Sequence, residues 1–112
     1  KAPEKTIAFL IFKNQRQEVF LKKRPGKVIW GGLWSFEECD DNNDAINLAI
    51  RQHNNRAKII RPLSKFKHAF THFTLWVNPI LIDSPGGSTN YYEINSLTLG
   101  TPAPVKKILQ EL

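Results

Sequence analysis

The chain has 112 residues, 41% of them apolar and 23% charged, and this ordinary globular balance predicts one domain over residues 1–112. Lys and Arg outnumber Asp and Glu by 16 to 10, so the net charge of +6 favours a polyanionic partner. The single cysteine, Cys39, excludes an internal disulfide framework and a cysteine-based zinc site, and no apolar run is long enough to cross a membrane.

The first half of the chain predicts a hairpin, a loop and a helix. Residues 6–12 are continuously apolar and predict a strand buried on both faces, and residues 18–24 predict its hairpin partner. Residues 34–38 predict a short strand after Gly31-Gly32. Asp44 is the expected N-cap of a helix over residues 45–53, because Ile46 and Ile50 recur at helical spacing.

The second half predicts mainly strands. Residues 58–62, 65–71 and 73–83 read as strands, and Pro79 implies a bulge or a sheet edge in the last of them. A loop over residues 83–88 and a short strand over residues 91–94 follow. Pro104 opens a final helix, with Val105, Ile108 and Leu109 on its apolar side. The fold class is therefore α+β.

Residues 65–73 concentrate three Phe, two His, two Lys and one Thr, without an acid. Aromatic side chains, a hydroxyl and cations together are typical of nucleic-acid recognition. His68 and His72 cannot share a metal ion on a strand, where four residues span about 13 Å. A structural interpretation stays open for several residues: Phe66, Phe70 and Phe73 as core, His68 as a structural histidine, and Trp30 and Trp34 as core or loop anchors.

A hairpin, a Gly-Gly loop and a helix in this order resemble the Nudix fold. Nudix hydrolases hold a divalent metal on glutamates of the motif Gly-x5-Glu-x7-Arg-Glu-U-x-Glu-Glu-x-Gly-U, where U is a bulky aliphatic residue. With Gly32 and Glu38 in register, the Arg-Glu pair falls on Ile46-Asn47 and the Glu-Glu pair on Ile50-Arg51. The helix carboxylates are missing, so we expect no catalytic residue and no metal site in this chain.

Four ordered blocks narrow the resemblance: Lys-Lys-Arg-Pro at 22–25, Trp-Gly-Gly-Leu-Trp-Ser-Phe at 30–36, Phe-Lys-His-Ala-Phe-Thr-His-Phe at 66–73, and Leu-Gly-Thr-Pro-Ala-Pro-Val at 99–105. They resemble the C-terminal domain of A/G-specific adenine DNA glycosylases of the MutY type. The resemblance implies a Nudix-like mixed sheet with two helices packed on it. It also implies recognition of 8-oxoguanine opposite misincorporated adenine in duplex DNA, during base excision repair.

The family's usual Phe-Ser-His loop corresponds to Phe70, Thr71 and His72. Oxidation at C8 converts guanine N7 from an acceptor into an N–H donor, and the Thr71 hydroxyl or a loop carbonyl supplies an acceptor. Lys65 and Lys67 are expected to attract phosphates. The resemblance thus implies a DNA- and lesion-binding site made of Phe70, Thr71, His72, Lys67 and Lys65.

The same resemblance implies that an absent N-terminal helical domain, with an iron–sulfur cluster, flips out and excises the adenine. This chain, which has no methionine and opens on polar residues, is then expected to be a non-enzymatic part of a longer glycosylase without a cofactor of its own. Its partners would be duplex DNA containing 8-oxoguanine opposite adenine and its own catalytic domain, and the protein would be a cytoplasmic, nucleoid-associated monomer. Two alternatives stay open: a Nudix-type pyrophosphohydrolase of oxidised purine nucleotides, and a protein-interaction module.

Overall fold

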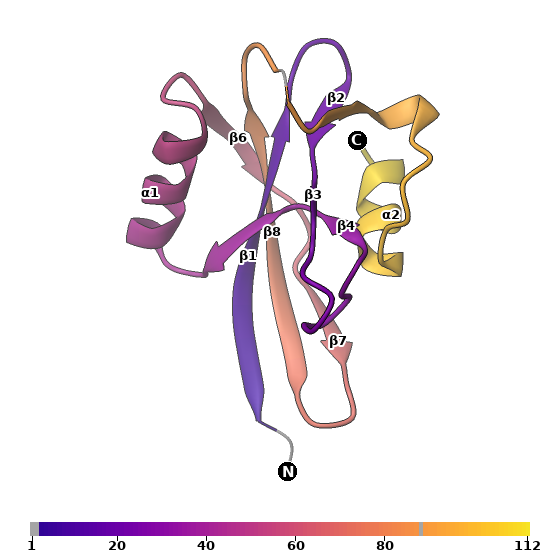
Figure 1. Ribbon diagram of the computed structural model, residues 1–112. Helices are drawn as coiled ribbons and strands as arrows, with labels where there is room; N and C mark the ends of the chain where they lie inside the picture. The colour runs from indigo at the N-terminus through magenta and orange to yellow at the C-terminus, as the bar shows by residue number, and fades with distance from the viewer. Residues whose placement is uncertain (1–2, 88) are drawn as a thin grey trace.

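The computed structural model describes residues 3–87 and 89–112, and it has a mixed β-sheet with one helix on each face (Figure 1). Strands β1 (Glu4–Lys13) and β8 (Thr74–Asp83) run parallel through its centre and pair along all ten residues. The sheet order is β6-β8-β1-β2-β9, with β5 also on β1 and β7 also on β8. The α+β, Nudix-like expectation is confirmed.

The remaining elements are shorter. The other strands of the main sheet are β2 (Glu18–Phe20), β5 (Glu37–Asp40), β6 (Lys58–Pro62), β7 (Phe66–Ala69) and β9 (Tyr91–Glu93). A separate two-stranded sheet consists of β3 (Lys22–Lys23) and β4 (Trp34–Ser35). The helices are α1 (Asn43–His53), a 3-10 turn (Ile94–Ser96) and α2 (Ala103–Gln110). No helix among the described residues is long and apolar enough to cross a membrane.

Side chains along β1 point alternately to the two faces of the sheet, and this divides the core into two layers. Ile7, Phe9 and Ile11 pack on the face covered by α2, together with Val105, Ile108 and Leu109 of that helix. Ala8, Leu10 and Phe12 pack on the opposite face, against Ile46 and Ile50 of α1. Successive strand residues point to opposite faces, so a strand covered on both sides must be apolar throughout. This confirms the predicted two-faced burial for residues 7–12, whereas Thr6, the first residue of the predicted run, is exposed.

Three local predictions need correction. The strand predicted over residues 18–24 divides at Leu21, which is fully buried and donates its N–H to Asn90 O at 3.0 Å, so β2 and β3 join different sheets. The strand predicted over residues 34–38 divides at the buried Phe36. The N-cap of α1 is Asn42, whose side chain accepts from the Ala45 N–H at 2.8 Å, and Asp44 lies inside the first turn.

Pro79 lies in the central strand β8, so the predicted bulge or edge at this residue is wrong. The interruption lies in the neighbouring chain instead. β7 pairs with Thr74 to Val77 and β6 with Ile80 to Asp83, which leaves residue 79 opposite the connection between them. The Pro79 carbonyl accepts the Leu63 N–H there at 2.9 Å. Proline has no backbone N–H to donate, and on this side of β8 none is needed at Pro79, because no strand residue lies opposite it.

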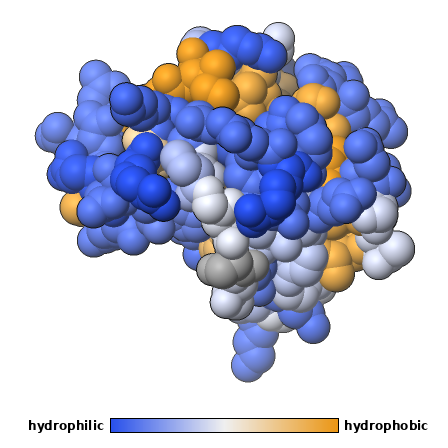
Figure 2. Space-filling view, turned by 90° about the horizontal axis from the view of Figure 1, so that it is seen from above, coloured by the Kyte–Doolittle hydropathy of each residue, from blue (hydrophilic) through white to orange (hydrophobic). Residues whose placement is uncertain are grey.

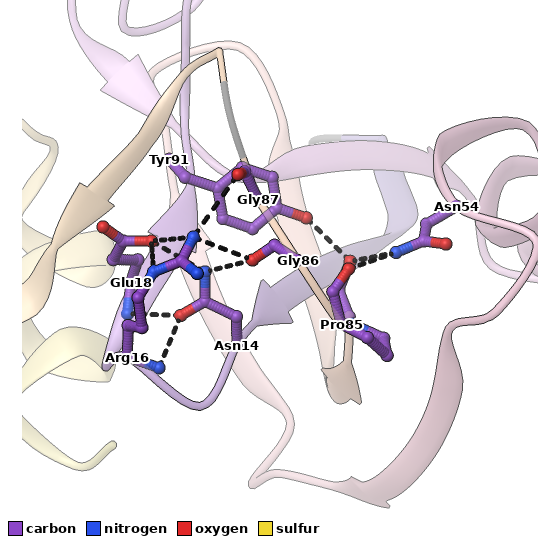
Figure 3. A network of polar contacts seen from close by, with 9 residues as sticks. Asn14, Arg16, Glu18, Asn54, Pro85, Gly86, Gly87 and Tyr91 are labelled. Atoms are coloured by element: carbon purple, nitrogen blue, oxygen red, sulfur yellow. Dashed lines mark hydrogen bonds and ion pairs between the residues drawn. The ribbon is translucent and has the colours of Figure 1, made fainter.

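The end of the molecule opposite the β7–β8 hairpin is closed by polar contacts (Figure 3). The buried Asn14 amide donates to Gly86 O at 2.7 Å and to the Glu18 carboxylate at 2.8 Å, which ties the β1–β2 turn to the β8–β9 loop. Ser84 Oγ lies 2.7 Å from the Tyr91 hydroxyl. Seen from this end, the surface is largely hydrophilic (Figure 2). Ser88, in the predicted loop, and Lys1 and Ala2 lie outside the described residues.

Candidate nucleic-acid interface

The β7–β8 hairpin presents the predicted lesion-binding residues at one end of the molecule (Figure 1). Ala69 pairs with Thr74, and the Phe70 N–H donates to Phe73 O at 2.8 Å, which closes the connection over residues 70–73. Thr71 and His72 occupy the tip, and both are exposed. A short, closed turn therefore holds a hydroxyl and an imidazole outside the body of the domain.

Four aromatic side chains, Trp30, His68, Phe70 and Phe73, form a cluster below this tip, called here the aromatic anchor. The Phe70 and Phe73 rings stack with centroids 4.9 Å apart and planes 19° apart. His68 lies 4.6 Å and Trp30 5.7 Å from the Phe70 ring, centroid to centroid. Phe70 is thus half-buried between neighbours, and in this structure it supports the tip.

Trp30 reaches the anchor because the loop between β3 and β4 is tightly folded. Trp30 itself has a positive φ of 56°, and a Cβ added to Gly31 would lie only 2.5 Å from Gly26 O. The Arg24 guanidinium binds the Glu38 carboxylate and donates from Nε to Ile29 O at 2.7 Å. An ion pair and close backbone packing therefore fix Trp30 against the hairpin.

Lys65 and Lys67 lie on the other face of the sheet from the anchor. Lys67 pairs with Trp76, whereas His68 pairs with Leu75, and neighbouring strand residues point to opposite faces. The two ammonium groups lie 5.7 and 5.5 Å from the centre of the Trp76 ring, within range of a cation–π interaction. The structure brings Phe70, Thr71 and His72 together but separates both lysines from them.

A cavity of about 270 Å³ lies beside the anchor, between the β3–β4 loop and the sheet. Its walls combine aromatic, apolar and charged side chains: Trp30, Phe73, Ile7, Ile29, Leu75, Lys5, Arg24, Glu38, Cys39 and Asp40. Burial, and secondarily the carboxylates of Asp40 and Glu37, raise the pKa of the Cys39 thiol, so it is a weak nucleophile at neutral pH. No group of three or more His, Cys, Asp or Glu that could hold a metal ion occurs in residues 3–87 and 89–112.

Sequence reasoning left part of this interface out. Trp30 and His68 were interpreted as structural residues, and the structure shows that this structural role is to support the tip. The pairing of Arg24 with Glu38 was not predicted, because Arg24 lies in the loop after β3 and Glu38 lies 14 positions later in β5. Neighbouring residues of a strand point to opposite faces, so the predicted strand already implied that Lys67 and His68 lie on different faces of the sheet.

Comparison with known proteins gives consistent results. A family profile for the NUDIX domain matches residues 7–111. The adenine DNA glycosylase of Buchnera aphidicola subsp. Baizongia pistaciae (strain Bp) is 32% identical over 116 residues, covering 96% of this chain and 33% of that protein. The adenine DNA glycosylase of Buchnera aphidicola subsp. Acyrthosiphon pisum (strain APS) is 31% identical over 117 residues, with the same coverage. The chain spans about one third of the length of these curated relatives.

Two solved structures show the same fold. The MutT protein from Methanosarcina mazei Go1 superposes with a TM-score of 0.73 at 10% identity, covering 99% of this chain and 94% of that one. The C-terminal domain of mouse MUTYH, solved in complex with human PCNA, gives 0.68 at 16% identity, covering 94% and 84%. At these identities the likeness establishes the architecture.

Proposed function

This chain belongs to the NUDIX domain family, and we propose that it is the lesion-recognition domain of an adenine DNA glycosylase. In this proposal it binds duplex DNA at 8-oxoguanine opposite adenine, and the excision of adenine takes place in a separate part of the protein. The relatives' name supports a glycosylase as the parent protein. NUDIX proteins of several kinds share this fold, so the fold alone does not distinguish DNA binding from nucleotide hydrolysis.

The observation that carries the proposal is the exposed Thr71-His72 tip on a rigid support. A group that reads a base edge must project from the protein surface and keep its direction. The closed turn and the aromatic anchor satisfy both conditions for the Thr71 hydroxyl. This hydroxyl can accept the N7–H that guanine gains on oxidation, and unmodified guanine has no donor at that position.

Electrostatics support DNA as the partner. Between Asp44 and Asp83 the sequence has no acid, and this stretch includes the whole β7–β8 hairpin. Lys65 and Lys67 lie on the flank of the hairpin rather than at its tip, so their role would be attraction of phosphates and not reading of the base. Binding should therefore weaken with added salt, whereas the preference for the lesion should not depend on these lysines.

The proposal is tested by changing the hydroxyl alone. Thr71→Val keeps the shape of the side chain and removes the acceptor, and Thr71→Ser keeps the acceptor. In the parent glycosylase, adenine excision would be measured opposite 8-oxoguanine and opposite guanine. Loss of one hydrogen bond that leaves the lesion's donor unpaired corresponds to about 1–2 kcal/mol, so Thr71→Val should reduce the preference roughly 5- to 30-fold. Thr71→Ser should retain it.

Thr98→Ala, at an exposed threonine outside the hairpin, is the matched control and should leave the preference unchanged. An undiminished preference in Thr71→Val would show that the Thr71 hydroxyl does not read the lesion. Magnesium-dependent hydrolysis of 8-oxo-dGTP by the 112-residue chain would support the hydrolase alternative. An absence of any salt-dependent affinity for duplex DNA would support a protein-interaction module instead.

A further inference from the structure

Strand β6 is unusual because all five of its residues are exposed. Ile59 and Ile60, in its middle, are 49% and 54% exposed and are two of the large apolar side chains on the surface. Single exposed apolar residues need no explanation, but here two follow one another on a sheet edge, and the register shift between Ile59 and Arg61 interrupts the alternation that would otherwise point them to opposite faces. Neither residue belongs to the hairpin or to the cavity beside it.

β6 is also an edge of the main sheet. It stands at the end of the strand order and, in the part of the chain that the structure describes, pairs with β8 alone. The register shifts between Ile59 and Arg61, so Ile60 lies at an irregularity of the ladder. An unpaired strand edge offers backbone N–H and C=O groups to a further strand, and natural edges are usually protected by charges, prolines or bulges. Here Lys58, Pro62 and the irregularity flank two uncovered isoleucines.

We propose that the β6 edge binds an extended segment of a partner protein, in which apolar residues alternate with acidic ones, as an additional strand. The apolar side chains would cover Ile59 and Ile60, and the acidic ones would pair with Lys58 and Arg61. Asp83 lies opposite Lys58 in β8 and offsets part of its charge, so Arg61 is the stronger determinant. Main-chain bonds would supply affinity and the side chains specificity, as in other β-strand additions.

The charges on β6 favour an acidic and apolar partner strand over two other partners, a second copy of this chain and a nucleic acid. Antiparallel pairing of β6 with a second copy of itself would bring Lys58 and Arg61 of one copy close to those of the other, which is unfavourable. A nucleic acid would match the cations, but its phosphate backbone would leave Ile59 and Ile60 without an apolar partner. An acidic and apolar strand satisfies the backbone edge, the isoleucines and the cations together.

The connection that follows β6 leads into a second cavity, of about 450 Å³, between β7 and α2. Leu63 and Ser64 line it directly after the strand, and Phe66, Pro79 and Ile108 supply apolar walls. A partner segment that continues past Pro62 therefore meets a recess with room for an apolar side chain. The partner is expected to carry such a residue just beyond its strand.

The test is selection of a phage-displayed library of random octapeptides on the 112-residue chain. The enriched peptides should alternate apolar residues with Asp or Glu. A synthetic copy should shift the backbone amide resonances of β6 and slow their hydrogen exchange. Lys58→Glu with Arg61→Glu should weaken this peptide roughly tenfold or more and should select peptides rich in Lys and Arg instead. Lys23→Glu with Lys27→Glu, at two exposed lysines far along the chain from β6, is the control for net charge.

Ile60→Thr keeps a β-branched residue in the strand, so it separates loss of the apolar contact from loss of folding. It should weaken the selected peptide while the melting temperature stays close to that of the parent chain. The proposal is overturned if no peptides are enriched, if they shift resonances elsewhere, or if the charge swap leaves their composition unchanged. It is also overturned if duplex DNA alone shifts the β6 amides, or if sedimentation shows a dimer that Ile60→Thr dissociates.

Discussion

The aromatic anchor makes a quantitative prediction about Phe70. Replacing a fully buried Phe by Ala destabilises a protein by about 3–5 kcal/mol. Phe70 is only half-buried, near a hairpin tip, but it has ring contacts with Phe73, His68 and Trp30, each of the kind that adds about 0.5–1.5 kcal/mol. We therefore expect Phe70→Ala to lower the free energy of unfolding by about 2 kcal/mol, or the melting temperature by about 8 °C.

Urea denaturation followed by tryptophan fluorescence measures this loss, and a DNA-binding assay on the same variant gives it a functional meaning. Phe70→Leu keeps most of the apolar volume and should lose clearly less stability. Thr71→Ala, at the exposed tip, should stay within about 0.5 kcal/mol of the parent chain. If Phe70→Ala left stability unchanged and still abolished lesion binding, Phe70 would be a wedge that contacts DNA, and the reasoning from the anchor would be refuted.

Two further predictions concern other parts of the chain. Gly31→Ala should destabilise by about 1–3 kcal/mol, because its Cβ would lie 2.5 Å from Gly26 O, whereas Gly26→Ala meets no atom within 4 Å and should be neutral in the same melting assay. Burial lowers the pKa of His53, so the unfolded chain binds its proton more readily and stability should fall as pH drops below about 6.5. His53→Phe should flatten that part of the curve of melting temperature against pH, and equal slopes in the two proteins would contradict the assignment.

The pattern of apolar residues was sufficient to predict most of the elements. The continuous buried run is confirmed over residues 7–12, and so is the helical spacing of Ile46 and Ile50, because both depend only on local periodicity and burial. Proline at the start of α2 was equally informative, since the helix begins at Ala103 and Pro104 lies in its first turn. Such features are set by the conformational preferences of neighbouring residues.

Pairing between distant segments was harder to predict. Leu21 reads as the middle of one strand, but it lies where the chain passes from one sheet to another, which depends on β4 and β9. Pro79 reads as an edge residue, but the break is in the connection between β6 and β7. Ile59 and Ile60 read as ordinary strand residues, and only the sheet order shows that they are uncovered.

In the candidate site, too, the local segment was predicted and the contacts with distant segments were not. The segment that contains Phe70, Thr71 and His72 was predicted from composition and resemblance, and the structure places it on a closed hairpin. The binding roles of these residues, and of Lys65 and Lys67, stay predictions. The support from Trp30 could not be predicted as a contact, because it depends on the fold of a loop about 40 residues earlier in the chain.

The parallel pairing of β1 with β8 has a consequence for how the chain folds. Each residue of β1 pairs with one that lies 70 positions later, as Lys13 does with Asp83. At a synthesis rate of about 5–20 residues per second, β1 waits roughly 4–14 seconds on the ribosome before its partner exists. During that time β2 and β5 can already pair with one edge of β1, but the edge that β8 will occupy has no partner. Folding should therefore be slow for a domain of this size, and the nascent β1 segment should be a preferred site for chaperone binding.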